Sequence, residues 1–481
     1  MTLVDYLTIL PIAALIVWAL LLLMVDLWIP PDRKGLTALL AAFGLAVSLG
    51  LTLAQGGRSE LAFQGMVMLD GFAVYMNVLY LVSGLVVVAL SHDYLKRTSN
   101  NRGEFYPLMM FSVSGMMLLT QAYNLIVVFL AIEFLSIPLY VLAGIARQRL
   151  ESEESALKYF LLGTFSSAFV LYGVALIFGA TATTGMESIV LVVQNGEANL
   201  VLFVAGAALM LVGFGFKVAA VPFHEWAPDV YQGAPTPISS FMAVAVKAAG
   251  FAALLRVFLT IFPTVAADLV TIGWGIAALT MVVGNVVAIA QTNLKRLLAY
   301  SSIAHAGYLL VAFTAFGDGQ IAGQAVAAMV YYLAAYALTT FGAWAVVISV
   351  ETGEGKGLEL VDYAGLGPRY PWLGLSMLVF MLSLTGVPLT IGFWGKFFLF
   401  RTAVDAGFVT LALIGLLTSL VSAYYYLQVV VVMFMRPGEP RVRRDSWLSL
   451  VVIGAALAVV GLSVFPNQLL QLAAQAVLRL Q

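Results

Sequence analysis

The 481-residue sequence contains no cysteine and only three histidines, His92, His224 and His305. Without cysteine, the chain cannot form disulfides, hold zinc through thiolates or ligate iron–sulfur clusters. Three histidines leave little with which to ligate haem or copper. The composition therefore predicts that the chain itself carries no redox cofactor and no metal.

Charge is also scarce, since only 10% of the residues are Asp, Glu, Lys or Arg, against about 25% in an ordinary soluble domain. The 23 Lys and Arg nearly balance the 24 Asp and Glu. A nucleic-acid-binding surface needs a basic patch, and the sequence has none, so nucleic acid is excluded as a partner. In contrast, 62% of the residues are hydrophobic and the mean hydropathy is +1.01. These values predict a protein whose partner is the lipid bilayer.

Apolar runs long enough to cross about 30 Å of hydrocarbon occur fourteen times. The sequence therefore predicts an all-α polytopic membrane protein with about 14 transmembrane helices, the first retained as an anchor because no basic residue precedes it. The runs lie near residues 7–29, 36–54, 71–91, 105–121, 124–146, 155–179, 199–231, 237–262, 266–291, 296–316, 320–350, 371–403, 406–435 and 447–466. Residues 467–481 alternate Leu with Gln and Ala, which favours a helix lying at the membrane interface.

Lysine and arginine in the connections indicate the orientation, because they collect on the cytoplasmic side. Fifteen of the 23 cations fall in odd-numbered connections, and four, Arg58, Arg256, Arg401 and Arg479, fall on the other side. This distribution predicts a multi-pass protein of the cell inner or plasma membrane, with both termini outside, on the periplasmic side. The cations assigned to the cytoplasmic side include Arg33, Lys96, Arg147, Arg149 and Arg444.

The remaining four cations lie within apolar runs: Lys158, Lys217, Lys247 and Lys396. A lysine at the middle of a spanning helix costs about 2.5–3.5 kcal/mol on insertion scales, so such residues mark functional positions. Glu133 and His305 each lie about nine residues into their own runs. Because burial disfavours the charged form of an amine, a row of such groups can hold or release protons near neutral pH, titrating as a coupled set.

Prolines interrupt three of the runs, at Pro138, Pro222 and Pro388. Proline deprives the carbonyl four residues earlier of its donor and bends or breaks the helix there. Val-Pro in the middle of the seventh and twelfth runs predicts discontinuous helices, the kind that builds ion sites at the membrane midplane.

An internal repeat is predicted from the match of Lys158-Tyr159-Phe160-Leu161 with Val330-Tyr331-Tyr332-Leu333. Helices four to eight and nine to thirteen would then form two five-helix repeats, and because five is odd the second is inverted. The expected organisation is a three-helix segment at 1–104, the repeats at 105–262 and 263–435, and a last helix with its tail at 436–481.

Structural interpretations compete with the functional ones. A buried Glu–Lys pair can simply pin two helices together. Lys158 is equally compatible with a lysine at the membrane surface paired with Glu154, and Lys295 with an ordinary cytoplasmic cation. His224, beside Glu225, can act in transfer or form a local hydrogen bond.

Two long motifs resemble those of the antiporter-like membrane subunits of respiratory complex I, a family whose kin include the Mrp cation/proton antiporter subunits. They are KVAAVPFHEWAPDVYQGAPTP at 217–237 and QTNLKRLLAYSSIAHAGY at 291–308. The segment PDVYQGAP at 228–235 is similar to the N-type subunits, and Lys396 is similar to the N- and L-type subunits, whereas the M-type has Glu there. The chain stops without the long lateral helix of the L-type. The resemblance implies fourteen helices in two inverted repeats with broken helices seven and twelve.

The resemblance also implies roles. Glu133 would pair with the proton-carrying Lys217, Lys247 would connect the two halves, His305 would lie between them, and Lys396 would exchange protons with the outside. The implied function is proton translocation by a subunit of NADH:quinone oxidoreductase, driven by electron transfer in partner subunits. NADH, FMN, iron–sulfur clusters and quinone are expected in those partners, beside M-like, K-like and J-like membrane subunits. An Mrp-type antiporter subunit without redox coupling and a purely structural scaffold are the alternatives.

Overall fold

The computed structural model describes residues 2–98, 100–146, 149–263, 266–315, 321–353, 355–443 and 445–476. Arg147, Arg444, Arg479 and the end of the expected C-terminal tail lie outside these residues. The described chain is built almost entirely of helices, so the all-α prediction is confirmed.

The first half of the chain begins with two long helices, a short hairpin and a third long helix. Its elements are α1 (Leu3–Asp26), α2 (Gly35–Leu53), β1 (Glu60–Ala62), β2 (Val67–Leu69), α3 (Gly71–Arg97), α4 (Phe105–Gln121), α5 (Leu125–Ala143), α6 (Leu150–Thr181), α7 (Met186–Gln194), α8 (Leu200–Val218), α9 (Trp226–Gly233), α10 (Thr236–Phe241), the π-helical turn η2 (Met242–Val246) and α11 (Lys247–Ile261). The antiparallel β1–β2 hairpin and the nine-residue α7 were not expected, since neither is long enough to appear as a span.

The second half repeats the succession of long helices and ends on a short one. Its elements are α12 (Ala266–Ile289), α13 (Leu294–Thr314), α14 (Ala322–Val350), the 3₁₀ turn η5 (Leu360–Tyr363), α15 (Leu366–Arg369), α16 (Pro371–Thr385), α17 (Ile391–Asp405), α18 (Val409–Met435), α19 (Ser446–Gly461) and α20 (Pro466–Gln475). The interfacial helix expected near the C-terminus corresponds to α20.

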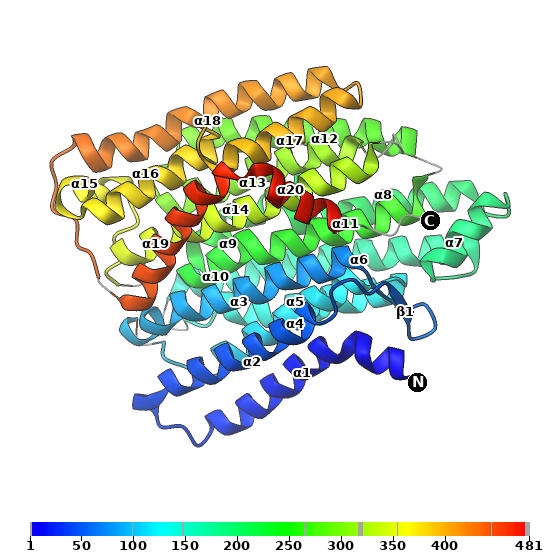
Figure 1. Cartoon of the computed structure of the whole chain (residues 1–481), viewed down its shortest axis with the longest axis horizontal. Helices are drawn as coiled ribbons and strands as arrows, with labels where there is room; N and C mark the ends of the chain where they lie inside the picture. Colours follow the sequence, from blue (N-terminus) through cyan, green and yellow to red (C-terminus); the bar gives the residue numbers. More distant parts are fainter. Residues whose placement is uncertain are drawn as a thin grey trace.

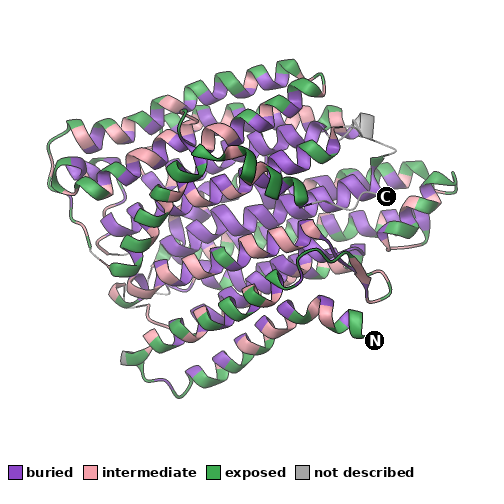
Figure 2. Cartoon of the chain, viewed as in Figure 1, coloured by how far each residue is buried: buried purple, intermediate pink, exposed green. Residues whose placement is uncertain are grey.

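The long helices lie roughly side by side, with α1 and α2 at one edge of the molecule and α18 at the other (Figure 1). α19 and α20 pack against α14 across one face of this layer. Burial is concentrated in the central helices, whereas α1, α2 and α18 show alternating buried and exposed stripes (Figure 2). Exposed leucine and valine on these outer helices fit a surface that faces lipid rather than water.

Twelve helices of the described chain are long and apolar enough to cross a membrane. The two expected spans missing from that set are α4, which has 17 residues, and the 371–403 run, which is divided into α16 and α17. All fourteen apolar runs are thus helical, but the number of spans and the inverted repeats stay predictions.

Two of the three prolines expected to break helices lie in breaks. α8 ends at Val218, whose carbonyl would have bonded to the residue that is Pro222, and α9 starts only at Trp226. α16 ends at Thr385, and Gly386 adopts the left-handed conformation, with φ of 90°, before Pro388.

The expected break at Pro138 is wrong, because α5 continues through this residue. The Ser136 hydroxyl donates to the Ile132 carbonyl at 2.5 Å, which ties the backbone together close to the proline. Neighbouring helices and local side-chain bonds can hold a proline inside a membrane helix in this way.

Arg256, which falls within the expected 237–262 run, lies in α11 with a fully buried side chain. Its guanidinium forms two hydrogen bonds to the Asp70 carboxylate, at 2.6 and 2.9 Å. A third bond, 3.0 Å long, reaches the Thr120 carbonyl at the end of α4. Because Asp70 also caps α3 by accepting from the Ala73 N–H, one ion pair joins the ends of three helices.

The substitution Asp70→Asn tests this ion pair. The amide oxygen that it introduces can still cap α3, but Arg256 is left buried without a counter-charge, which costs about 3–5 kcal/mol. We expect the free energy of unfolding in detergent, measured by denaturant titration, to fall by this amount. Asp405→Asn is the matched control, because its i,i+4 partner Arg401 is 65% exposed, and we expect a change below about 1 kcal/mol. Equal losses in the two variants would contradict the assignment.

Candidate functional site

Lys217, Lys247, His305 and Lys396 are all buried, and none is more than 5% exposed. They come from four helices: α8 packs against α11, and α13 packs against α17. Burial of this kind is costly for a charged group unless oxygen or nitrogen atoms replace its water shell. The partners of each group therefore indicate what the site can do.

Lys217 lies in the last turn of α8, directly before the break. Its ammonium donates a 2.7 Å hydrogen bond to the Ser136 hydroxyl on α5 and lies 6.0 Å from the centre of the Phe216 ring. Glu133, one helical turn from Ser136, acts on Lys217 electrostatically but forms no ion pair with it. Its Oε1 atom is buried and has no hydrogen-bond partner within the described part of the chain. Direct contact between Glu133 and Lys217, implied by the resemblance, is thus absent from this conformation.

Lys247 lies at the start of α11 and contacts α13. Its ammonium donates a 2.5 Å hydrogen bond to the Ser302 carbonyl. One turn further along α11, Gly250 packs tightly on α8: a Cβ atom there would lie 3.1 Å from a Val218 methyl and 3.4 Å from the Lys217 Cβ. This glycine therefore allows the helix bearing Lys247 to approach the helix bearing Lys217.

The His305 ring lies between two tyrosine hydroxyls. Nδ1 is 2.5 Å from the Tyr332 hydroxyl of α14, and Nε2 is 3.1 Å from the Tyr426 hydroxyl of α18. The Tyr426 hydroxyl also bonds the Ser301 hydroxyl. The ring is within electrostatic range of both Lys247 and Lys396. Every link in this cluster is a group that can both donate and accept a proton.

Lys396 lies at the second break and forms the other end of the site. Its ammonium donates to the carbonyls of Leu384 and Thr385, at 2.8 and 2.9 Å, and to the Ser419 hydroxyl, at 2.7 Å. Leu384 is four residues before Pro388, so its carbonyl is the one that the proline deprives of a backbone donor. The negative end of the α16 dipole adds to the attraction.

A single face of α13 links the two ends of the site. Ser302, His305 and Tyr308 are spaced by three residues and therefore share that face. The Ser302 carbonyl accepts a hydrogen bond from Lys247, and the centre of the Tyr308 ring lies 4.7 Å from the Lys396 Nζ atom. Going from α5 to α18, the central row, defined here as Glu133, Ser136, Lys217, Lys247, Ser302, His305, Tyr332, Tyr426, Lys396 and Ser419, forms a band of polar groups across the molecule.

Lys158 is not part of the central row. Its side chain is 40% exposed and pairs with Glu154 and with Asp229, both at 2.7 Å. The local pairing with Glu154, one of the two interpretations from the sequence, is thus present, and Asp229 joins it. Asp229 also pairs with Arg296 at 2.7 Å.

Lys158 and Asp229 line a polar cavity of about 350 Å³ between α6 and α9, near the start of α13. Arg149, one of the cations from which the sequence predicts the cytoplasmic side, also lines it. Its other polar lining residues are Glu151, Glu154, Gln232, Asn293 and Glu359.

His224 and Lys295 have different surroundings. His224 lies half-buried in the α8–α9 break, where its ring forms a local hydrogen bond with the Pro222 backbone, while its Nδ1 has no partner among the described residues. Lys295 is fully buried and donates a 2.6 Å bond to the Ala234 carbonyl, which an ordinary surface cation would not do.

Sequence reasoning missed Tyr332, Tyr426, Ser136 and Ser419. Tyr332 lies in the segment Val330–Leu333, whose match with Lys158–Leu161 predicts the internal repeat, so the sequence contains a signal for this residue. The other three are common residue types in membrane helices, and only the packing of α5 and α18 against the central helices brings them to the lysines.

Residues 122–422 match the family model described as NADH:quinone oxidoreductase/Mrp antiporter, transmembrane. The chain belongs to this family. The match covers both breaks and every member of the central row except Tyr426. It confirms the resemblance inferred from the two motifs.

Within the family, the chain is similar to proteins named NADH-quinone oxidoreductase subunit N. The one from Trichlorobacter lovleyi is 46% identical, with 98% of this chain and 96% of the relative covered. The one from Chloroflexus aggregans is 43% identical, with 96% and 95% covered. The resemblance to the N-type branch is thereby confirmed.

Solved structures of family members have the same fold. A chain of respiratory complex I from Thermus thermophilus with bound aureothin is 38% identical, with a TM-score of 0.82, covering 96% of this chain and 99% of that one. A chain of the Mrp complex from Dietzia sp. DQ12-45-1b has a TM-score of 0.86 at 19% identity, covering 99% and 97%. The second likeness concerns the fold alone.

Proposed function

We propose that the chain is the N-type membrane subunit of an NADH:quinone oxidoreductase and that it carries protons along the central row. The observation that supports this most is the burial of Lys217, Lys247, His305 and Lys396, with one face of α13 joining the Ser302 carbonyl that binds Lys247 to the Tyr308 ring beside Lys396. The similarity to proteins named subunit N supplies the reaction, electron transfer from NADH to quinone.

Protons enter, in this proposal, from the cytoplasmic side through the polar cavity beside Lys158 and Asp229. They leave on the opposite side from Lys396, through the α16–α17 break. The two breaks would then serve two linked half-channels facing opposite sides of the membrane, one in each of the inverted repeats predicted at 105–262 and 263–435. Both termini would lie on the periplasmic side.

The energy for transport must come from outside the central row, because moving one charge against 100 mV costs about 2.3 kcal/mol. We assign this role to electron transfer in partner subunits, which would hold the flavin, iron–sulfur and quinone chemistry. The partners are M-like, K-like and J-like membrane subunits. In this mechanism, a change in charge at the subunit border alters the distance between Glu133 and Lys217 and thereby the proton affinity of Lys217.

The present contacts support such a two-state pair. Lys217 is held by the neutral Ser136 hydroxyl, while Glu133, one turn away, keeps a buried oxygen without a partner among the described residues. A short movement of either side chain would exchange one acceptor for the other. Opposite charges in a low-dielectric interior interact strongly, so this exchange changes how firmly the amine holds its proton.

Lys217→Ala and Glu133→Ala test the row in the assembled complex. Both variants should lose most proton pumping, measured as fluorescence quenching of a pH-sensitive dye in inverted membrane vesicles during NADH oxidation. Arg401→Gln removes an exposed charge and should leave pumping unchanged. Full pumping by both row variants would refute the proposal and favour the structural scaffold.

The hydroxyls on His305 provide a second test. Tyr332→Phe combined with Tyr426→Phe removes both of them without changing side-chain volume appreciably. Since positioned proton-transfer groups contribute about 10²–10⁴-fold, we expect the pumping rate to fall at least about tenfold. Tyr424→Phe, on the exposed side of α18, is the control and should pump normally. A double variant that pumps at the wild-type rate would exclude the Tyr332 and Tyr426 hydroxyls from the pathway.

Co-purification separates the redox complex from the Mrp-type alternative. An affinity tag on this chain should bring down, in mild detergent, an assembly with flavin and iron–sulfur absorbance that is bleached or shifted by NADH. An assembly that lacks both chromophores and exchanges cations for protons would favour the antiporter.

A further inference from the structure

Three cavities outside the central row lie end to end along α3. The first, about 340 Å³, is polar and basic, and lies where α2 begins and α3 ends. Its lining side chains include Arg33, His92, Lys96 and Asn101. No carboxylate of the described chain lines it, and the nearby Asp26 is neutralised by a 2.6 Å ion pair with Lys34.

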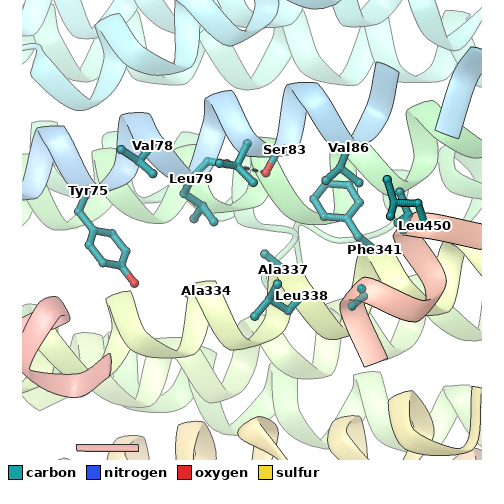
Figure 3. Close-up of a pocket in the computed structure, with 14 residues that line it drawn as sticks. Tyr75, Val78, Leu79, Ser83, Val86, Ala334, Ala337, Leu338, Phe341 and Leu450 are labelled. Carbon is teal, nitrogen blue, oxygen red and sulfur yellow. Dashed lines mark hydrogen bonds between the residues drawn. The ribbon is translucent and has the colours of Figure 1, made fainter. Parts of the chain in front are cut away.

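The second and third cavities are apolar and continue the first. The second, about 320 Å³, is bounded by α2, α3 and α19 and shares Leu39 and His92 with the first. The third, about 450 Å³, lies between α3, α14 and α19 and shares Val82, Val86 and Leu450 with the second. Figure 3 shows the side chains of α3 and α14 facing each other across the third cavity, with Leu450 at one end. Together they form one groove, called here the α3 groove.

The second cavity of the α3 groove is as long as one lipid leaflet is thick. His92 and Val82 mark its ends on α3 and are ten residues apart, or about 15 Å along the axis, and the third cavity continues along α3 to Tyr75. A length of about 15 Å is half of the roughly 30 Å hydrocarbon thickness. Trp447, which is 48% exposed, lines the second cavity beside His92, at the level where tryptophan meets lipid headgroups.

The polar end of the groove is built for an anion at the membrane surface. Arg33 and Lys96 are both exposed there, and each belongs to a connection assigned to the cytoplasmic side. Gly35 starts α2 at this point, and no side chain caps that helix, so the positive end of its dipole adds to the same field. A basic pocket between helices on the cytoplasmic side attracts anionic headgroups.

We propose that the α3 groove binds an anionic phospholipid of the cytoplasmic leaflet. The headgroup phosphate lies between Arg33 and Lys96, and an acyl chain runs along the second cavity into the third. A soluble phosphate would use only the basic end, and a zwitterionic lipid only the apolar part. Because the α3 groove has both a basic end and an apolar part, it fits a phospholipid with net negative charge.

The test uses the assembled complex in nanodiscs of phosphatidylcholine that contain a minor fraction of phosphatidylglycerol with a photoactivatable acyl chain. Mass spectrometry should find the crosslinked lipid on peptides from α3 and α19. Arg33→Gln and Lys96→Gln should each lower this labelling about fivefold, because a basic residue at the surface contributes about that factor to the attraction of anionic lipid. Arg58→Gln, an exposed arginine outside the groove, should not lower it.

The apolar part is tested by Gly454→Leu. Gly454 lines the third cavity, and a Cβ atom there meets no protein atom within 4 Å, so the leucine fills the groove without disturbing the fold. Gly461→Leu is the matched control on the same helix, also facing open space but away from the groove. We expect labelling to fall severalfold in the first variant only.

Four results would overturn the proposal. One is wild-type labelling in the Arg33→Gln/Lys96→Gln double variant. Another is equal labelling by a photoactivatable phosphatidylcholine. The third is a crosslink from the groove to another subunit in place of lipid. The fourth is wild-type labelling in Gly454→Leu, since the acyl chain would then lie elsewhere.

Discussion

The central row depends on how a buried ammonium group is stabilised. Each of its three lysines donates to neutral oxygens, from a serine hydroxyl or a backbone carbonyl, and none pairs with a carboxylate of the described chain. A carboxylate partner would hold the proton firmly and would be stranded as a buried charge once the proton left. A neutral oxygen accepts from the amine in both protonation states. The site therefore tolerates loss and gain of a proton at each position.

The helix breaks supply some of these acceptor oxygens, as unpaired backbone carbonyls. A continuous helix uses its carbonyls internally, whereas a helix that ends inside the membrane leaves several unpaired. At the end of α16, Pro388 removes the donor for Leu384, and the ammonium of Lys396 takes its place. At the end of α8, Trp226 Nε1 bonds the Phe216 carbonyl beside Lys217. Each break is thus part of the site, and at each one a side chain donates a hydrogen bond to a backbone carbonyl near the end of the interrupted helix.

Much of this arrangement follows from the sequence, because a lysine or proline in an apolar run is conspicuous on its own. The fold class, the two breaks and the burial of Lys217, Lys247 and Lys396 were predictable for this reason. The Tyr426 hydroxyl beside His305 was not, since a tyrosine in a membrane helix has no signal of its own and its place depends on packing between distant helices, whereas Tyr332 lies in the segment that suggested the repeat. The ion pair of Arg256 was not predictable either, because its partner Asp70 is 186 residues away.

The π-helical turn Met242–Val246 determines which neighbours the helix around Lys247 can reach. This turn holds one residue more than an α-helical turn. The side chains of α11 are therefore rotated about the helix axis by about 100° relative to those of α10. Accordingly, α10 packs against α3, α9 and α14, while α11 packs against α4, α7 and α8. The helix formed by α10, the π-helical turn and α11 therefore presents different faces to two sets of neighbouring helices. A continuous α-helix of the same sequence could pack against only one of these sets.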